Sequence, residues 1–263
     1  MIFKLLDTAQ NTKIIGFCAI VLTILACIFF TIKSPKFNQD LPKDNFVTLN
    51  IRKIAEPVYS DTSDPASQEP LEIGLMQASG LAFKTINGIT YILTAEHFCV
   101  EINQENDSIA TAITGVIISS EITVEDFNGD SWSANVLYTD SSLDICLVSS
   151  TMPSVNEIPI ALTPPKIGEE VYVISAPKGI SSPGVALHFK GEFSGCNSGN
   201  FCFYTMTSTF GSSGSVILNS DNEMIGMIQA TPMEIENVSI GSGLHQIVYF
   251  LTNASAAIDI NLL

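Results

Sequence analysis

The stretch Thr207–Ile228, TSTFGSSGSVILNSDNEMIGMI, places a small polar loop directly before two short apolar runs. The runs are separated by SDNE, a composition typical of a turn between two strands. The loop GSSGS has two interpretations. Gly-Ser segments are usually flexible linkers, whereas a serine held in a tight turn can act as a nucleophile if the chain supplies a base for its proton. The rest of the sequence must therefore contain that base.

The region from about residue 71 onward has a pattern of short strands separated by turns. Apolar runs are joined at Asn87-Gly88 and again at Asn128-Gly129, and Asn-Gly is the strongest short signal for a β-hairpin. No long amphipathic helix precedes residues 245–258, HQIVYFLTNASAAI, which predict a short closing helix. The pattern predicts an all-β domain, built as a sandwich or as a set of barrels.

The composition is that of a folded protein with a strongly acidic surface. Hydrophobic residues make up 46% of the 263 residues and charged residues 14%, so the chain can bury a sizeable core. The formal net charge is −16, and Arg52 is the only arginine. Nucleic-acid binding needs clustered cations, so we expect no nucleic acid as a partner. Cysteines and histidines lack zinc-site spacing, and we expect no metal and no cofactor.

One stretch predicts contact with a lipid bilayer. Residues 14–32, IIGFCAIVLTILACIFFTI, carry no charged residue, and about 20 apolar residues span a bilayer as a helix. A cleaved signal peptide is the alternative, but it usually ends in a small-x-small cleavage site, which this run lacks. ILAC, Ile24–Cys27, loosely resembles a lipoprotein cleavage box. We predict a single-pass membrane protein with its transmembrane anchor at residues 14–32.

The remaining chain divides by composition. Residues 1–13 form a short N-terminal tail, and residues 33–70, rich in polar residues and proline, are expected to be a tether and loop. Residues 71–263 are expected to form one domain. Lysines lie on both sides of the apolar stretch, so the positive-inside rule gives no orientation. We expect the domain to lie outside the cytoplasm.

Four cysteines follow the apolar stretch. Cys196 and Cys202 could close a short disulfide loop in an oxidising compartment. Cys146 lies in an apolar run and is expected to be a buried thiol, whereas Cys99 could be either a thiol or a disulfide partner.

Candidates for a base and its orienting acid are present. His97 ends an apolar run in YILTAEHFC, and Asp144 begins another in SSLDICLVSS. Taken singly, each has a structural interpretation, as does Ser213 in the glycine-serine loop. Together they occur in the order His, Asp, Ser, which is the order of the catalytic triad in the double-β-barrel peptidases. This order and the strand contexts favour Ser213 as a nucleophile.

These motifs resemble the trypsin/chymotrypsin-like peptidases, and within them the HtrA/Deg branch. LTAEH is similar to the family's Thr-Ala-x-His, and Asp140 and Asp144 match its Asp-x-x-x-Asp pattern. GEEVYVISAPKGI and GSSGSVILNSDNEMIGMIQA resemble two further family segments, and the match covers roughly residues 75–255. The resemblance implies a trypsin-like fold of two packed six-stranded antiparallel β-barrels.

The resemblance also implies roles for individual residues. Ser213 would attack the scissile carbonyl, His97 would take its proton, and Asp144 would hold the imidazole. The backbone N–H groups of Gly211 and Ser213 would form the oxyanion hole. The leading hypothesis is therefore a membrane-anchored serine endopeptidase acting on a polypeptide substrate.

Substrate-binding residues follow from the same comparison. Thr207 would lie at the base of the specificity pocket, and Gln229, Ala230 and Thr231 would form its wall and pair with an extended substrate. Since Thr207 carries no charge, we expect a small or medium apolar residue before the scissile bond.

Departures from the family pattern support other hypotheses. Gly214-Ser215-Val216 stands where the family has Gly-Gly-Pro, so a catalytically inactive, peptide-binding β-barrel module is the alternative. A third hypothesis is an enzyme that cleaves only its own tether, within residues 34–70. Members of the branch often assemble as trimers, but no residue here requires a homo-oligomer.

Overall fold

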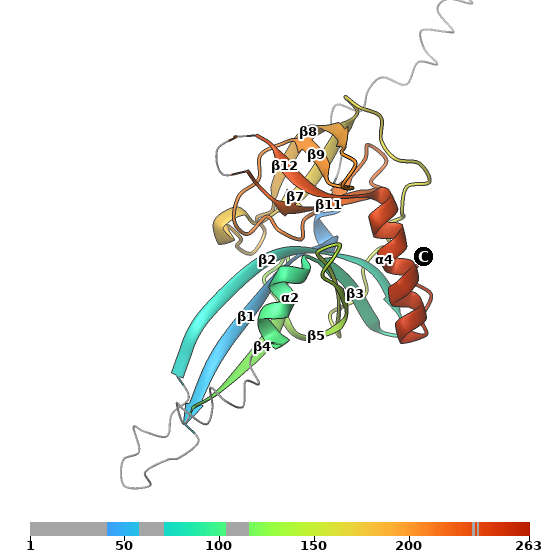
Figure 1. Cartoon of the computed structure of the whole chain (residues 1–263). Coiled ribbons are helices and arrows are strands. Elements are labelled where there is room, and N and C mark those ends of the chain that lie inside the picture. The colour runs from blue at the N-terminus through green and yellow to red at the C-terminus, as the bar shows by residue number, and fades with distance from the viewer. Residues whose placement is uncertain (1–40, 58–70, 104–115, 233–234, 236) are drawn as a thin grey trace, which may run out of the picture. The chain divides into compact units, whose positions relative to one another are not determined.

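Two closed antiparallel barrels, each of six strands, form the described part of the chain (Figure 1). The structure is a computed structural model, and it describes residues 41–57, 71–103, 116–232, 235 and 237–263. The prediction of an all-β fold with two six-stranded antiparallel barrels is confirmed. Within these residues no helix combines the length and the apolar character that a membrane crossing needs. The predicted anchor at residues 14–32 lies outside them.

The first barrel contains both predicted hairpins. Asn87 and Gly88 have φ angles of 52° and 79°, the positive values that a two-residue hairpin turn requires and that Asn-Gly adopts readily. The strands are joined in the order β1-β2-β3-β6-β5-β4, and β4 pairs with β1 to close the barrel. Their bounds are β1 Phe46–Pro57, β2 Leu71–Ile86, β3 Ile89–Thr94, β4 Val116–Asp126, β5 Ser131–Asp140 and β6 Ile145–Ser150.

Strand β1 corrects the predicted domain boundary. The predicted tether and loop, residues 33–70, includes strand β1 of the first barrel and a short 3-10 helix, η1 (Lys43–Asn45), directly before it. Val47, Leu49 and Ile51 alternate with polar residues and are fully buried, as one face of a half-buried strand requires. This alternation was missed because polar segments flank it on both sides.

The second barrel contains the segment quoted first. Its two apolar runs form strands β10 and β11, and the Asn219 side chain closes the turn between them by accepting N–H groups of Asp221 and Glu223. The strand order is β10-β11-β12-β9-β8-β7. The bounds are β7 Glu170–Ser175, β8 Leu187–Cys196, β9 Cys202–Thr205, β10 Val216–Leu218, β11 Met224–Ala230 and β12 Ser239–Gly243.

Helix α4 (Leu244–Ile258) is the predicted closing helix, and it lies against both barrels (Figure 1). Its Ile247, Phe250 and Leu251 are fully buried in one core that also contains Leu93 of β3 and Met227 of β11. Burial of apolar surface stabilises the folded state by roughly 25 cal/mol of free energy per Å². The barrels therefore share an apolar core, which fixes the ends of their strands relative to one another.

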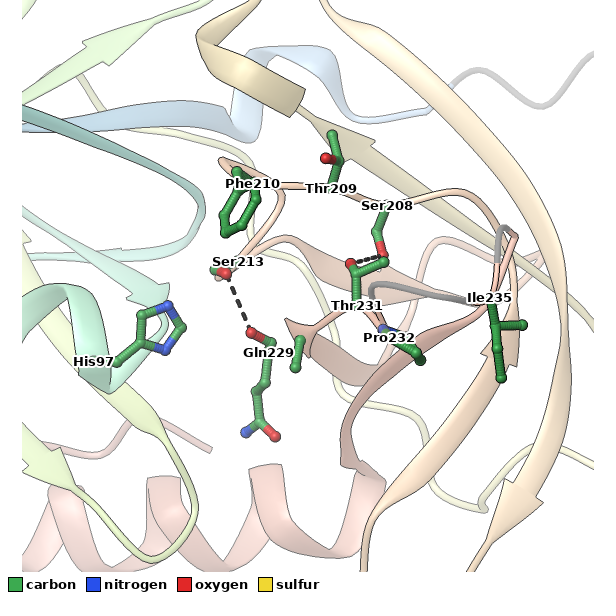
Figure 2. A pocket seen from close by; sticks show the side chains of 10 residues that line it. His97, Ser208, Thr209, Phe210, Ser213, Gln229, Thr231, Pro232 and Ile235 are labelled. Carbon is green, nitrogen blue, oxygen red and sulfur yellow. Dashed lines mark hydrogen bonds between the residues drawn. The ribbon is translucent and has the colours of Figure 1, made fainter.

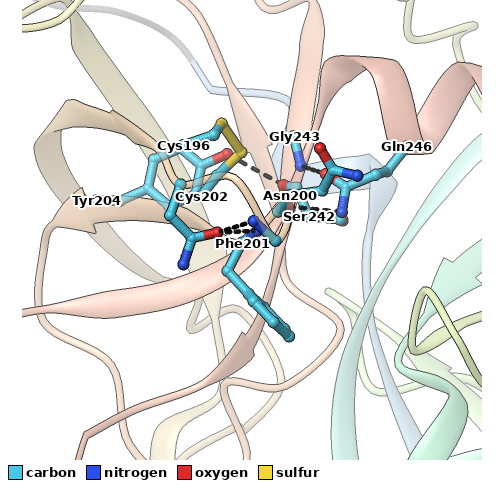
Figure 3. The surroundings of a disulfide bond; sticks show 10 residues. Cys196, Asn200, Phe201, Cys202, Tyr204, Ser242, Gly243 and Gln246 are labelled. Atoms are coloured by element: carbon cyan, nitrogen blue, oxygen red, sulfur yellow. Dashed lines mark hydrogen bonds between the residues drawn. A yellow bond between two sulfur atoms is a disulfide. The ribbon is translucent and has the colours of Figure 1, made fainter.

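Two disulfides are formed in the described residues. Cys196 and Cys202 face each other across β8 and β9, beside Gly243 and Gln246 (Figure 3). Cys99 pairs with Cys146, so the prediction of a buried thiol at Cys146 is wrong. The partner was missed because Cys99 lies on a short helix, α2 (Glu96–Asn103), that no sequence pattern predicted.

Candidate active site

His97 and Asp144 form the centre of the candidate site. His97 is the second residue of α2, and its Nδ1 lies 3.0 and 2.9 Å from the two carboxylate oxygens of Asp144. The backbone N–H of His97 donates to the same carboxylate at 2.8 Å. A carboxylate beside Nδ1 favours the tautomer with the proton on that nitrogen. The other ring nitrogen, Nε2, is then a proton acceptor.

A capped turn places Asp144 beside α2. Asp140 Oδ1 accepts the N–H groups of Ser142 and Leu143 at 3.0 and 3.2 Å, and also the Ser142 hydroxyl at 2.6 Å. Asp144 has a φ of 50°, a left-handed conformation that aspartate tolerates better than most residues. The Asp-x-x-x-Asp pattern therefore has a physical reason, because the first aspartate shapes the turn that presents the second.

Ser213 lies in the loop between β9 and β10. Gly211 and Gly214 flank it at φ +87° and +83°, a conformation that favours glycine. A Cβ atom at Gly214 would lie 2.2 Å from the Ser79 carbonyl oxygen, and one at Gly211 would lie 2.6 Å from that of Ala176. The GSSGS loop is therefore closely packed against neighbouring backbone, which is not the behaviour of a linker.

The Ser213 hydroxyl and His97 line the same pocket (Figure 2). In the rotamer present, the hydroxyl donates to the Gln229 carbonyl at 3.1 Å. Serine hydroxyls change direction by rotation between staggered χ1 rotamers. Such a rotation would redirect the proton from Gln229.

Two peptide groups direct their N–H away from the protein backbone. The Phe210 carbonyl accepts the Lys178 N–H at 2.5 Å, and the Ser212 carbonyl accepts the Ser215 N–H at 3.1 Å. A trans peptide is planar with its C=O and N–H opposed, so the N–H groups of Gly211 and Ser213 point the opposite way. Within the described residues, neither has a hydrogen-bond acceptor. Both can donate to an external oxyanion.

Ser79, on β2, joins the first barrel to the Ser213 loop. Its N–H donates to the Ser213 carbonyl at 3.0 Å, and its hydroxyl donates to the Gly211 carbonyl at 2.7 Å. The same hydroxyl accepts the Ala176 N–H, from the residue that follows β7, at 2.9 Å. Ser79 is not among the residues predicted for the site, since its only signal in the sequence is its place in the motif SGLAFK.

Gln229 makes a second link between the barrels. This residue is predicted for the pocket wall, and it lines the pocket. Its side-chain amide also donates to the carbonyl of Leu143 and, at 3.3 Å, to that of Asp144. The residue whose carbonyl holds the Ser213 hydroxyl thus holds the turn that presents Asp144.

The pocket has a volume of about 700 Å³, and the described residues around it carry neither carboxylate nor ammonium groups. Hydroxyls of Ser208 and Thr231 are 2.5 Å apart in its wall (Figure 2). The lining residues are His97, Ser208, Thr209, Phe210, Ser213, Gln229, Ala230, Thr231, Pro232 and Ile235.

Thr207 does not line the pocket, contrary to the sequence-based prediction. Its side chain is exposed and donates to Asn237 at 2.6 Å. Met206 and Ser208 are buried on either side of it. Neighbouring residues of an extended chain point to opposite sides, so the neighbour Ser208 takes the place expected for Thr207.

Comparisons with known proteins agree with this architecture. The family model "Trypsin-like peptidase domain" matches residues 78–227. A search of curated proteins found no match.

Solved structures with the same fold include two forms of the Mycobacterium tuberculosis protease Rv3671c. Its inactive mutant form has 13% sequence identity and a TM-score of 0.56, over 85% of this chain and 95% of that one. Its active form has 14% identity and a TM-score of 0.53, over 80% and 81%. A serine endoprotease from Yersinia pestis has 18% identity and a TM-score of 0.56, over 82% of this chain and 64% of that one.

The Ser79 hydroxyl is expected to contribute to stability. Ser79→Ala leaves the buried Ala176 N–H and the Gly211 carbonyl without their partner, which costs about 1–3 kcal/mol of unfolding free energy. Urea unfolding measures this loss. Ser175→Ala is the matched control, because the buried Ser175 hydroxyl makes no hydrogen bond within the described residues. An equal effect of both substitutions would contradict the linking role of Ser79.

Proposed function

The chain belongs to the trypsin-like peptidase family, and we propose that it is a serine endopeptidase acting through His97, Asp144 and Ser213. The observation that carries the proposal is the bonding of His97 Nδ1 to both oxygens of Asp144, in a pocket that Ser213 also lines. With the proton on Nδ1, Nε2 is the ring nitrogen that can act as the base for a nucleophilic serine.

The reaction follows from these atoms. Ser213 Oγ attacks the scissile carbonyl carbon as His97 Nε2 takes its proton, and the Asp144 carboxylate stabilises the imidazolium. The N–H groups of Gly211 and Ser213 donate to the tetrahedral oxyanion. His97 then gives the proton to the leaving amine, and water hydrolyses the acyl-enzyme by the same steps.

Substrate binding would release the Ser213 hydroxyl. That hydroxyl now donates to the Gln229 carbonyl. A polypeptide that pairs as an added strand with residues 229–231 donates its own backbone N–H to carbonyls of this edge. We propose that the substrate replaces Ser213 as the donor to Gln229, so that the hydroxyl turns to His97 when a peptide is present.

Labelling with a fluorophosphonate probe tests the nucleophile. We expect the full chain to be labelled and Ser213→Ala to remain unlabelled, because only an activated serine attacks the phosphorus. Ser220→Ala is the matched control, since Ser220 is an exposed serine in the β10–β11 turn, and it should be labelled like the parent.

Two outcomes would contradict the proposal. Labelling that survives Ser213→Ala would mean that another serine reacts. A folded parent that binds peptides but resists labelling would support the inactive peptide-binding module, which the hydrogen bond from Ser213 to Gln229 favours as a second candidate.

The pocket supports an uncharged side chain before the scissile bond. Its described lining offers Ser208 and Thr231 hydroxyls and apolar surface, and burying an unpaired charge there is costly. Fluorogenic peptides should be cleaved with a kcat/KM about tenfold or more higher for alanine or valine at that position than for lysine. Equal or faster cleavage after lysine would refute this specificity.

We further propose that residues 14–32 anchor the enzyme in a membrane, with the peptidase domain outside the cytoplasm. The two disulfides support an oxidising compartment. The full chain should stay in the membrane pellet during alkaline carbonate extraction. Leu25→Lys with Ile28→Lys should move it to the soluble fraction, because each charge costs about 2.5–3.5 kcal/mol in a membrane helix.

The same preparation tests the alternative of self-cleavage. Mass spectrometry should find the sequence intact from residue 1. A mature N-terminus within residues 34–70 that Ser213→Ala abolishes would instead support an enzyme that cleaves its own tether.

A further inference from the structure

A second pair of residues repeats the spacing of His97 and Asp144. Cys99 follows His97 by two residues, Cys146 follows Asp144 by two residues, and both pairs are separated by 47 positions. Cys99 and Cys146 form a disulfide. The two segments that carry the proposed base and acid are therefore joined twice, once by hydrogen bonds and once covalently.

The disulfide lies on the inner side of this junction. Residues two apart on a helix point to opposite sides, so α2 turns His97 outward and Cys99 inward. The His97 side chain is 50% exposed, whereas Cys99 and Cys146 are fully buried in the core of the first barrel. Cys146 pairs in the sheet with Thr94, the last residue of β3. The disulfide thus attaches α2 to the strand that begins directly after Asp144.

Other contacts also hold α2 against the Asp144 turn and the barrel core. The Ser141 hydroxyl donates to Glu96 at 2.5 Å, and Phe98 is buried with Cys99 in the same core. The helix has only eight residues, and so short a helix is unstable without tertiary attachment. The disulfide is the only covalent link between this helix and β6 in the described part of the chain.

We infer that the Cys99–Cys146 disulfide is a positioning element for the His97–Asp144 pair, and that a dithiol reductant slows the reaction of Ser213 by breaking it. The inference rests on the proposed function. One thiolate of the dithiol attacks a sulfur of the disulfide, which releases one cysteine thiolate and forms a mixed disulfide with the other cysteine. The second thiol of the reductant then attacks this mixed disulfide and releases the second cysteine. Two electrons pass to the protein, which gains two thiols, and the dithiol becomes a cyclic disulfide. Because both cysteines are buried, the exchange requires α2 to move away from the barrel.

The first test removes the crosslink by substitution. Cys99→Ala and the double variant Cys99→Ala with Cys146→Val are compared with the parent by the kinetics of fluorophosphonate labelling of the full chain. We expect the maximal labelling rate to fall roughly 10- to 100-fold, because a displacement near 1 Å has that effect on a reacting group. The probe concentration for half-maximal rate should not change, since the pocket residues that the second barrel contributes, Ser208 and Thr231 among them, are not altered.

The matched control removes the other disulfide. Cys196→Ala with Cys202→Ala should label within about twofold of the parent, as expected for a change away from reacting groups. An equal loss of rate in this control would overturn the inference, since any disulfide would then have the same effect. So would an unchanged rate in folded variants that lack Cys99–Cys146.

A thermodynamic cycle separates positioning from general loss of structure. Asp144→Asn is introduced with and without the disulfide. If the disulfide acts through the His97–Asp144 pair, Asp144→Asn lowers the labelling rate by a smaller factor once the crosslink is gone. The effects of the two changes on the activation free energy are then not additive. Additive effects would show that the disulfide acts independently of the pair and would overturn the inference.

Chemical reduction provides a test that needs no substitution at Cys99 or Cys146. In the Cys196→Ala, Cys202→Ala variant, dithiothreitol should lower the labelling rate in step with alkylation of Cys99 and Cys146, and reoxidation should restore it. A constant rate despite complete alkylation of both cysteines refutes the inference, even if the substituted variants fail to fold.

Imidazole NMR signals keep the two proposals distinguishable. An oxidised parent that is never labelled refutes the proposed function but not the positioning role. That role is then decided by the signals of His97, which should change on reduction, while those of His188 on β8 and His245 on α4 stay constant. Unchanged His97 signals after reduction would refute it.

Discussion

The geometry of the candidate site depends on how firmly the two barrels are held together, because His97 and Asp144 come from one barrel and Ser213 from the other. Ser79 provides this constraint through one buried side chain and its own N–H. It binds the carbonyls of Gly211 and Ser213 and accepts the N–H of Ala176. A buried polar group without a partner is costly, so these bonds favour one relative position of the barrels and the serine loop. Helix α4 adds apolar packing to both barrels.

Within this two-barrel arrangement, neighbouring residues position the individual groups of the candidate site. The Asp140 cap makes the turn that holds Asp144 in a left-handed conformation, and Gln229 donates across the barrel junction to the same turn. The Lys178 N–H fixes the direction of the Gly211 N–H through the peptide plane that Gly211 shares with Phe210. Asp144 and the Gly211 N–H are therefore each held by a residue, Asp140 or Lys178, that takes no direct part in the proposed reaction.

The wrong predictions concern positions where the local pattern is weak or where a tertiary contact decides the outcome. Cys146 could not be assigned to Cys99 without α2, whose eight residues are too few for a clear helical period. Strand β1 was mistaken for tether because a single alternating segment among polar residues is a weak pattern. Ser208 lines the pocket in place of Thr207 because adjacent residues of the extended chain point to opposite sides. The burial of Met206 in the core sets which side each residue faces.

The sequence by itself determined the all-β class, both Asn-Gly hairpins, the closing helix and the order of His97, Asp144 and Ser213, because turn chemistry, strand alternation and motif order act over short distances. Only the tertiary structure decided that Asp144 bonds His97, that Ser79 and Gln229 join the barrels, and that Cys99 is linked to Cys146. These contacts connect residues that lie 47 to 132 positions apart. They arise because barrel closure brings such residues within bonding distance, which local patterns do not encode.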